Sequence, residues 1–175
     1  MPLEPGNNTT TMETVIHSLD YSLNFLADLI ADVGADDLTH QPVGHTNHPA
    51  WTIGHLTYIF DLIGSVIGIE SSLQPEWKRL FGSGSQPIND PEIYPSIDES
   101  RAFLRDRVDR LIDKLRTTND ADFDQEFPDK DYLAVFPTVR HALTQVLVGH
   151  TAFHVGQVAA WRKAMGLPSI KRSYE

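Results

Sequence analysis

The chain contains 175 residues, the length of one typical domain, and we expect a single domain over residues 9–170 between a flexible leader (residues 1–8) and a C-terminal tail (residues 171–175). Hydrophobic residues make up 41% and charged residues 22%, values that exclude a disordered or low-complexity protein. The 14 basic and 24 acidic residues give a net charge of -10, which disfavours nucleic acid and anionic membrane surfaces as partners.

The absence of cysteine excludes disulfides, thiolate metal sites and cysteine nucleophiles. Any thiol chemistry would therefore need an external thiol. The N-terminal residues lack the basic and apolar regions of a secretory signal, and no run of about 18 apolar residues lies near either end. We therefore expect a cytoplasmic protein without a membrane anchor.

The first predicted helix begins at the hydroxyl-bearing residues Thr9–Thr11 and ends near Val33, before Gly34. Its apolar residues recur at steps of three and four, the pattern that a helix buries in a bundle. They are Ile16, Leu19, Leu23, Leu26 and Ile30. One face of this helix is therefore expected in the core.

The second predicted helix follows His48, with Pro49 at its first position, and ends near Ile69. Residues 70–95 are rich in proline and glycine, and we expect a long connection with one short helical turn at residues 76–81. A connection of that length can cross a bundle.

The third predicted helix begins with a capping box, in which the Ser96 hydroxyl and the Glu99 carboxylate satisfy two free N–H groups. It is expected to end near Arg116. Phe103 belongs to its apolar face, whereas charged residues such as Arg107 are assigned to solvent.

The fourth predicted helix begins at Pro137-Thr138, continues to about Met165 and stops at Gly166. No segment shows the alternation of a strand or the glycine-rich loop of a phosphate site. The predicted fold class is therefore all-α, a four-helix bundle, and the sequence leaves open which neighbours run parallel.

His150 and His154 are four residues apart on the fourth helix, so at roughly 100° per residue they share one face. The rest of that face is apolar, and both side chains are expected to point into the bundle. His141 is expected on the opposite face from His150 and is given no role. A metal ion would satisfy one nitrogen of each buried ring. The alternative is two histidines with ordinary packing roles, because eight histidines readily produce one such pair by chance.

A third imidazole comes from the second helix, where His55 shares a face with Trp51 and Tyr58. The fourth helix has no acidic residue between Thr138 and Gly166, so histidine supplies its inward polarity. Two facing helices can thus offer three imidazoles to one ion.

Other metal architectures are excluded. Thr151 stands where a zincin carries its catalytic glutamate, and the Glu-x-x-His pairs of a di-iron bundle are absent. Three neutral imidazoles would leave one divalent ion on His55, His150 and His154 with an open position, as in catalytic sites. Such an ion activates a bound water or thiol near neutral pH.

The segments WTIGHL (residues 51–56) and HTAFHVGQ (residues 150–157) resemble those of the DinB/YfiT superfamily, and the resemblance spans nearly the whole chain. It implies a four-helix bundle, often a homodimer, with nickel or zinc on His55, His150 and His154. Some relatives resemble thiol-dependent S-transferases or isomerases, and others resemble hydrolases. A low-molecular-weight thiol is therefore a possible cosubstrate.

Three further residues are candidates for the pocket. His48 lies on the face of His55 but about 10 Å along the helix axis, too far to bind the same ion. We interpret it as a surface residue at the helix start or as an acid or base at the mouth of the site. Gln157 is expected to bond a bound water, a substrate or a buried backbone group. Tyr58 either forms a pocket wall or belongs to the core.

Three functions are consistent with these features. The first is a metal-dependent enzyme, a thiol-dependent S-transferase or a hydrolase, that acts on a small molecule. The second is a noncatalytic metal-binding or stress-associated protein whose ion organises the bundle, which the lack of an obvious acid or base beside the histidines favours. The third is a helical-bundle dimer without a metal, and metal analysis of the purified protein separates it from the other two.

Overall fold

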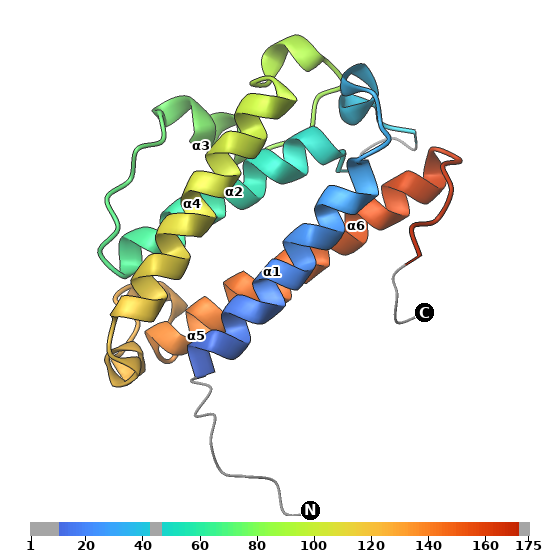
Figure 1. Cartoon of the computed structure of the whole chain (residues 1–175). Coiled ribbons are helices and arrows are strands. Elements are labelled where there is room, and N and C mark those ends of the chain that lie inside the picture. The colour runs from blue at the N-terminus through green and yellow to red at the C-terminus, as the bar shows by residue number, and fades with distance from the viewer. Residues whose placement is uncertain (1–10, 43–46, 172–175) are drawn as a thin grey trace, which may run out of the picture.

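The computed structural model describes residues 11–42 and 47–171, and most of these residues are helical (Figure 1). An isolated bridge between Glu126 and Thr138 is the only strand-like pairing in these two ranges. The expected leader (residues 1–8) lies outside them. The helical elements, in which η5 is a π-helix and the other η segments are short 3-10 helices, are α1 (Thr11–Ile30), η1 (Ala35–Thr39), α2 (Pro49–Val66), α3 (Pro75–Phe81), η2 (Pro91–Ile93), α4 (Ile97–Thr117), η3 (Asp120–Asp124), η4 (Lys130–Tyr132), α5 (Val139–Thr144), η5 (Gln145–His150) and α6 (Thr151–Ala164).

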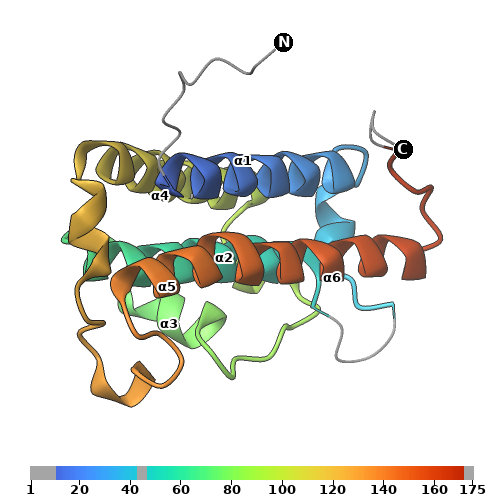
Figure 2. The same cartoon turned by 90° about the horizontal axis from the view of Figure 1, so that it is seen from below.

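The long helices lie in two layers (Figure 2). One layer contains α1 and α4, and the other contains α2 and the rod formed by α5, η5 and α6. Helix α3 packs against α2 on the side away from α1 and α4. Helices α2 and α4 run in the same direction, since Asp61 pairs with Arg107 and Gly64 lies beside Leu111. The long connection between them makes this parallel pairing possible.

Two separate apolar clusters stabilise this arrangement. The central cluster draws on all of the long helices, with Leu19 from α1, Phe60 from α2, Leu111 from α4 and Leu147 from η5 among its most buried members. The second cluster lies between α2 and α3 and the segment that follows: Trp51, Trp77, Leu80, Phe81 and Tyr94. Helix α2 is therefore buried on two faces, one toward the central core and one toward α3.

The predicted starts of the later helices are confirmed, whereas the caps expected at Thr9 and Thr10 for the first helix lie outside the described residues. Ser96 and Glu99 form the capping box of α4, and Thr138 caps α5 by accepting from the His141 N–H. Pro49 occupies the first turn of α2, and the short helical turn predicted at residues 76–81 is α3. These starts could be predicted because the residue types that cap or begin a helix are recognisable in the sequence.

Two helices end three residues earlier than predicted. After α1, the N–H groups of Ala31 and Val33 bond carbonyls three residues back, which tightens the chain into a turn. After α2, the Ile69 N–H bonds the Gly64 carbonyl across a turn in which Gly68 has a φ of 81°, a conformation that favours glycine.

The all-helical class is confirmed for the described chain, but a bundle of four helices is not. Helix α3 is an additional element, and the fourth predicted helix consists of α5, η5 and α6 rather than one uninterrupted α-helix. No helix in the described part of the chain is long and apolar enough to cross a membrane.

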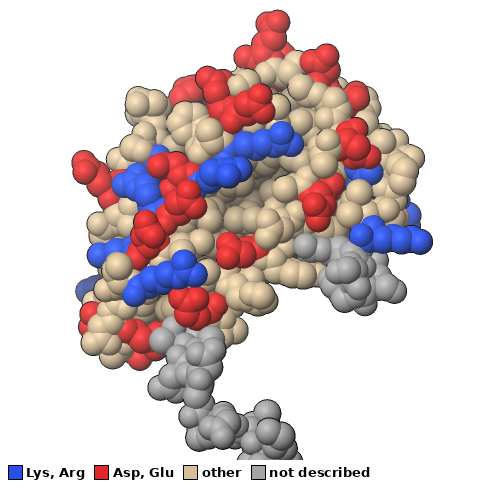
Figure 3. All heavy atoms as spheres, in the orientation of Figure 1, with Lys and Arg blue, Asp and Glu red and all other residues tan. Residues whose placement is uncertain are grey.

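The face formed by α1 and α4 carries a groove of about 510 Å³. Figure 3 shows this hollow between basic side chains along α4 and acidic side chains along α1. Arg101 and Arg105 line one side and Asp20 the other, whereas the remaining lining residues are mostly apolar. The groove exists because α1 and α4 pack less extensively than α2 and α4 do.

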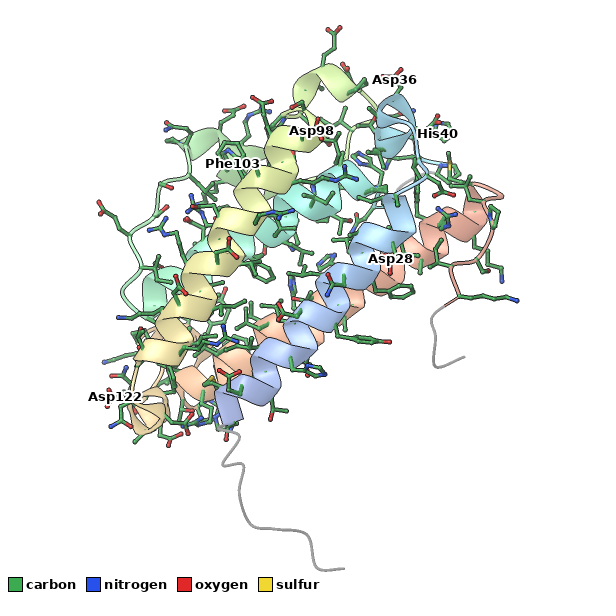
Figure 4. All side chains as sticks on the ribbon, viewed as in Figure 1. Asp28, Asp36, His40, Asp98, Phe103 and Asp122 are labelled. Carbon is green, nitrogen blue, oxygen red and sulfur yellow. The ribbon has the colours of Figure 1, made fainter. Side chains whose placement is uncertain are left out.

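Two residues of α4 lie in environments that differ from the prediction. Arg107, expected in solvent, is 4% exposed, and its Nε lies 3.0 Å from Oδ1 of Asp61 on α2. It also bonds Asp106 and Ser72, so it joins α2, α4 and the connection between them. Phe103, expected in the core, is 40% exposed and projects from α4 toward the Trp77 ring of α3 (Figure 4).

Replacing Arg107 with alanine is expected to lower the free energy of unfolding by about 3 kcal/mol, because Asp61 would remain buried without its cationic partner. The control is Asp109→Ala, which removes an exposed charged side chain of the same helix outside the groove and is expected to change stability by less than about 0.5 kcal/mol. Urea denaturation measures both values, and equal losses would contradict the structural role of the buried pair.

Candidate metal centre

Three imidazoles converge between α2, η5 and α6. The Nε2 atom of His150 lies 3.2 Å from Nε2 of His55 and 3.2 Å from Nε2 of His154. The ligand atoms of all three residues lie within 4.8 Å of one another. The three-histidine cluster predicted from the sequence is therefore present, although 95 residues separate His55 from His150 along the chain.

These distances fit a shared metal ion. Nitrogens that bind one tetrahedral zinc ion at about 2.0–2.1 Å lie about 3.3–3.4 Å from each other, close to the spacing around His150. The Nδ1 atom of His55 lies 2.6 Å from the Phe81 carbonyl, which can only accept, so Nδ1 carries the proton and Nε2 keeps its lone pair. A proton on His150 Nε2 can form a hydrogen bond to only one of the neighbouring nitrogens of His55 and His154 at a time. A metal ion, in contrast, would bind the lone pairs of all three nitrogens.

Burial keeps the three rings in the protonation state that metal binding requires. Burial, and then the charge of His55, lowers the pKa of His150 to about 4. Burial, and then the charges of His55 and His150, lowers the pKa of His154 to about 3. Burial also lowers the pKa of His55, against the opposing effect of the Phe81 carbonyl. All three rings are thus neutral at pH 7, as metal ligands must be.

The cluster lies at the edge of the central core, next to the second cluster, and two of its rings, His55 and His154, are buried. Along α2, His55 is one residue before Leu56 and two after Ile53, so it lies roughly 100° and 200° around the helix from these core residues. Its ring stacks on Trp51 of the second cluster, with ring centroids 4.6 Å apart and planes 10° apart. The site therefore lies where α2 faces η5 and α6, next to the end of α3.

The end of α3 orients His55 through the backbone. Phe81, the last residue of α3, supplies the carbonyl that accepts from His55 Nδ1–H. Its ring packs directly on Gly54, where a Cβ atom would lie 2.1 Å from the nearest ring carbon. Glycine at this helical position therefore makes room for α3, and this contact is what places the carbonyl at the histidine.

Trp51 fixes the same region from the other side. Its indole N–H lies within hydrogen-bonding distance of the Leu80 carbonyl (3.1 Å) and the Ser85 hydroxyl (3.0 Å). Because the same ring stacks on His55, these bonds restrict the position of the imidazole plane. Trp51 is thus both a member of the second cluster and a wall of the histidine site.

The three pocket candidates have other contacts. His48 is fully buried, so the surface interpretation is wrong: its Nδ1 accepts from the Trp51 N–H and its Nε2 donates to the Ile88 carbonyl. Burial lowers the pKa of His48 to about 4, which suits this neutral role. Gln157 accepts from the Asn47 amide (2.9 Å). Tyr58 is half-buried against the second cluster.

A cavity of about 640 Å³ opens beside His150. Its apolar lining comes from Val135, Phe136 and Val146, and its polar lining includes Gln145. His141 also lines it, so the prediction that His141 and His150 face opposite sides is wrong. That prediction assumed a regular α-helix, whereas the π-helical turn between them changes their relative direction.

The sequence-based prediction missed Gly54, the Phe81 carbonyl and the π-helix. A helical glycine costs about 0.5–1 kcal/mol relative to alanine, which draws attention to Gly54, but Gly156 on α6 has the same feature and no close neighbour, so the sequence does not distinguish the two. The role of Phe81 rests on a backbone atom, which no side-chain pattern reveals.

The sequence profile of one protein family, the DinB superfamily, matches residues 18–158 of the chain. The match contains all three histidines of the cluster and covers more than half of the chain. None of the curated proteins compared with the chain matches it.

Replacing Gly54 with alanine is expected to displace Phe81 and break its bond to His55, which would weaken zinc binding by about 10–100-fold. The matched control is Gly156→Ala on α6, where a Cβ atom meets nothing within 4 Å. Isothermal titration with zinc measures both affinities. An affinity of the Gly54 variant equal to that of the control would show that the Phe81 carbonyl does not orient the ligand.

Proposed function

Because the chain belongs to the DinB superfamily, we propose that it is a metal-dependent enzyme that acts on a small molecule through one divalent ion, nickel or zinc, bound by His55, His150 and His154. The observation that supports this proposal most directly is the position of His150, which belongs to the three-histidine cluster and also lines a cavity. A ligand of the ion would thus be adjacent to a space large enough for a substrate.

Three neutral imidazoles leave a divalent ion with its full charge and an open position, so when bound it supplies Lewis-acid activation of a water or a thiol. The residues around the histidines orient the His55 ring. The Phe81 carbonyl fixes the His55 tautomer, and Trp51 holds the plane of its ring. Both reactions that we propose, hydrolysis and thiol-dependent S-transfer, use this arrangement, and for S-transfer the thiol comes from a cosubstrate because the chain has no cysteine.

We propose that the substrate occupies the cavity beside His150. Arg140 is the only Lys or Arg among its lining residues, and it is already paired with Asp120 and Asp124. The lining is therefore mostly apolar and carries no unpaired Lys or Arg. Such a cavity suits an uncharged, partly apolar molecule.

The alternative function is a noncatalytic metal-binding or stress-associated protein. One observation favours it: the group of potential ligands contains three histidines and no carboxylate that could transfer a proton. The Nδ1 atoms of His150 and His154 are also buried without a hydrogen-bond partner among the described residues. These two ligands are thus less constrained than His55.

We further propose a four-helix bundle in which α3 is an added element, a single domain over residues 9–170, a cytoplasmic location and a homodimer.

The groove between α1 and α4 supports the dimer. Its acidic side (Asp20) and basic side (Arg101 and Arg105) would meet their opposites in a second copy related by a two-fold axis. Sedimentation velocity of the purified protein distinguishes monomer from dimer.

Replacing His55 with alanine is expected to abolish both metal retention and turnover, because two imidazoles remain for the ion. The control is His17→Ala, which removes an exposed histidine of α1. Bound metal is measured by mass spectrometry of the purified protein, and turnover with a panel of esters and of electrophiles supplied with a low-molecular-weight thiol. Turnover that survives in the His55 variant would refute the enzyme proposal, whereas bound metal without turnover on any substrate would favour the alternative.

Replacing Val135 with tryptophan is expected to fill the cavity and raise KM more than it lowers kcat, with metal content unchanged. Val135 is 64% exposed, so the larger side chain does not disturb the core. Leu62→Trp is the matched control, since Leu62 is also an exposed aliphatic residue and lies outside this cavity. Equal KM values for the two variants would place the substrate elsewhere.

A further inference from the structure

The π-helix η5 ends at His150, the first of the two histidines on the last rod. The Thr151 N–H bonds the Val146 carbonyl five residues earlier, which is the hydrogen bond of a π-helix. The Thr151 hydroxyl donates to the same carbonyl at 3.1 Å. One residue therefore makes two bonds to one carbonyl across the widened turn.

The widened turn determines which residues of the rod reach the central core. Leu143, Leu147, Thr151 and Val155 are all buried and recur at intervals of four residues. At 3.6 residues per turn, a regular helix would rotate such a series by roughly 40° at each step and move it off the core. A π-helix has more residues per turn, so this segment turns the chain back by about the same angle, and Leu147 and Val155 both face the core.

The same turn determines where the histidines point. A regular helix would place His150 and His154 on the inward stripe, as the sequence alone suggests. In the structure Thr151 (0% exposed) and Val155 (4% exposed) pack in the core, whereas the half-buried His150 lies toward His55. His154 is as buried as Val155, and its Nε2 meets that of His150. Core packing and the convergence of the imidazoles therefore depend on one local departure from α-helical geometry.

We propose that the π-helix positions the metal ligands and that Thr151, through its hydroxyl bond to Val146, is the positioning residue that holds it. This inference rests on the proposed metal site, because it assigns to Thr151 a function in presenting His150 and His154 to an ion. Thr151 itself does not belong to the cluster of potential ligands. The hydroxyl stabilises the π-helical turn because it gives the Val146 carbonyl a second hydrogen-bond donor from Thr151. In a regular α-helix this carbonyl would accept from the N–H of the residue four positions later.

Helix α2 offers a matched control. Thr57 is also fully buried, and its hydroxyl donates to the Ile53 carbonyl at 2.8 Å, four residues earlier in a regular helix. Thr57→Val and Thr151→Val remove the same hydroxyl group and keep the same side-chain shape. A general loss of stability should therefore be similar in the two variants, and any difference in metal binding reports on the π-helix.

The experiment measures zinc affinity and the absorption spectrum of bound cobalt in the wild type, Thr151→Val, Thr151→Ser and Thr57→Val. We expect Thr151→Val to weaken zinc binding about tenfold and to change the cobalt spectrum, and Thr151→Ser to restore both. Thr57→Val should bind zinc within about twofold of the wild type. A Thr151→Val protein with wild-type affinity and spectrum, or equal losses in both valine variants, would overturn the proposal.

Crystal structures of the metal-free proteins provide a readout that does not depend on metal binding. In Thr151→Val, or in a variant with Val148 deleted if the first does not fold, we expect α-helical bonding at residues 145–150 and separation of His150 Nε2 from His55 Nε2 beyond 3.2 Å. An unchanged π-helix and unchanged separation would overturn the positioning role. A wild type that binds neither zinc nor nickel would refute the proposed function and leave this comparison valid.

Discussion

The hydrogen bond from His55 to the Phe81 carbonyl is the interaction on which the site depends. It requires α3 to approach α2 closely, and that approach requires the absence of a side chain at Gly54. It also selects the tautomer of His55, so the Nε2 lone pair points toward the other two rings. A short helix that adds little to the central core thus determines the tautomer of His55, and this helix belongs to the long connection that lets α2 and α4 run parallel.

The location of the histidines beside the core separates two physical requirements. The central cluster is apolar and stabilises the fold through burial. The histidines border the second, mainly aromatic cluster, where they are desolvated enough to stay neutral yet remain next to an open cavity. Full burial in the central core would exclude a substrate, and full exposure would allow protonation of the rings.

The sequence was sufficient for features that depend on side-chain identity and regular periodicity. The capping box at Ser96, the proline at the start of α2 and the three-histidine cluster were all predicted correctly. Predictions failed where regular geometry was assumed. The π-helix rotated His141 and His150 onto one cavity, and the partner of Arg107 came from a different helix, so neither its burial nor its role was visible in the local pattern. Backbone partners such as the Phe81 carbonyl leave no trace in residue type.

The separation of the histidine cluster from the central core has a consequence for how the protein matures. The central cluster that joins the long helices consists of hydrophobic side chains, and their burial stabilises the fold whether or not an ion is bound. Metal would then enter a nearly preformed site through the cavity at His150 instead of nucleating the structure as in a zinc finger. Loading and exchange of the ion in the cell would accordingly follow metal supply rather than the rate of protein folding.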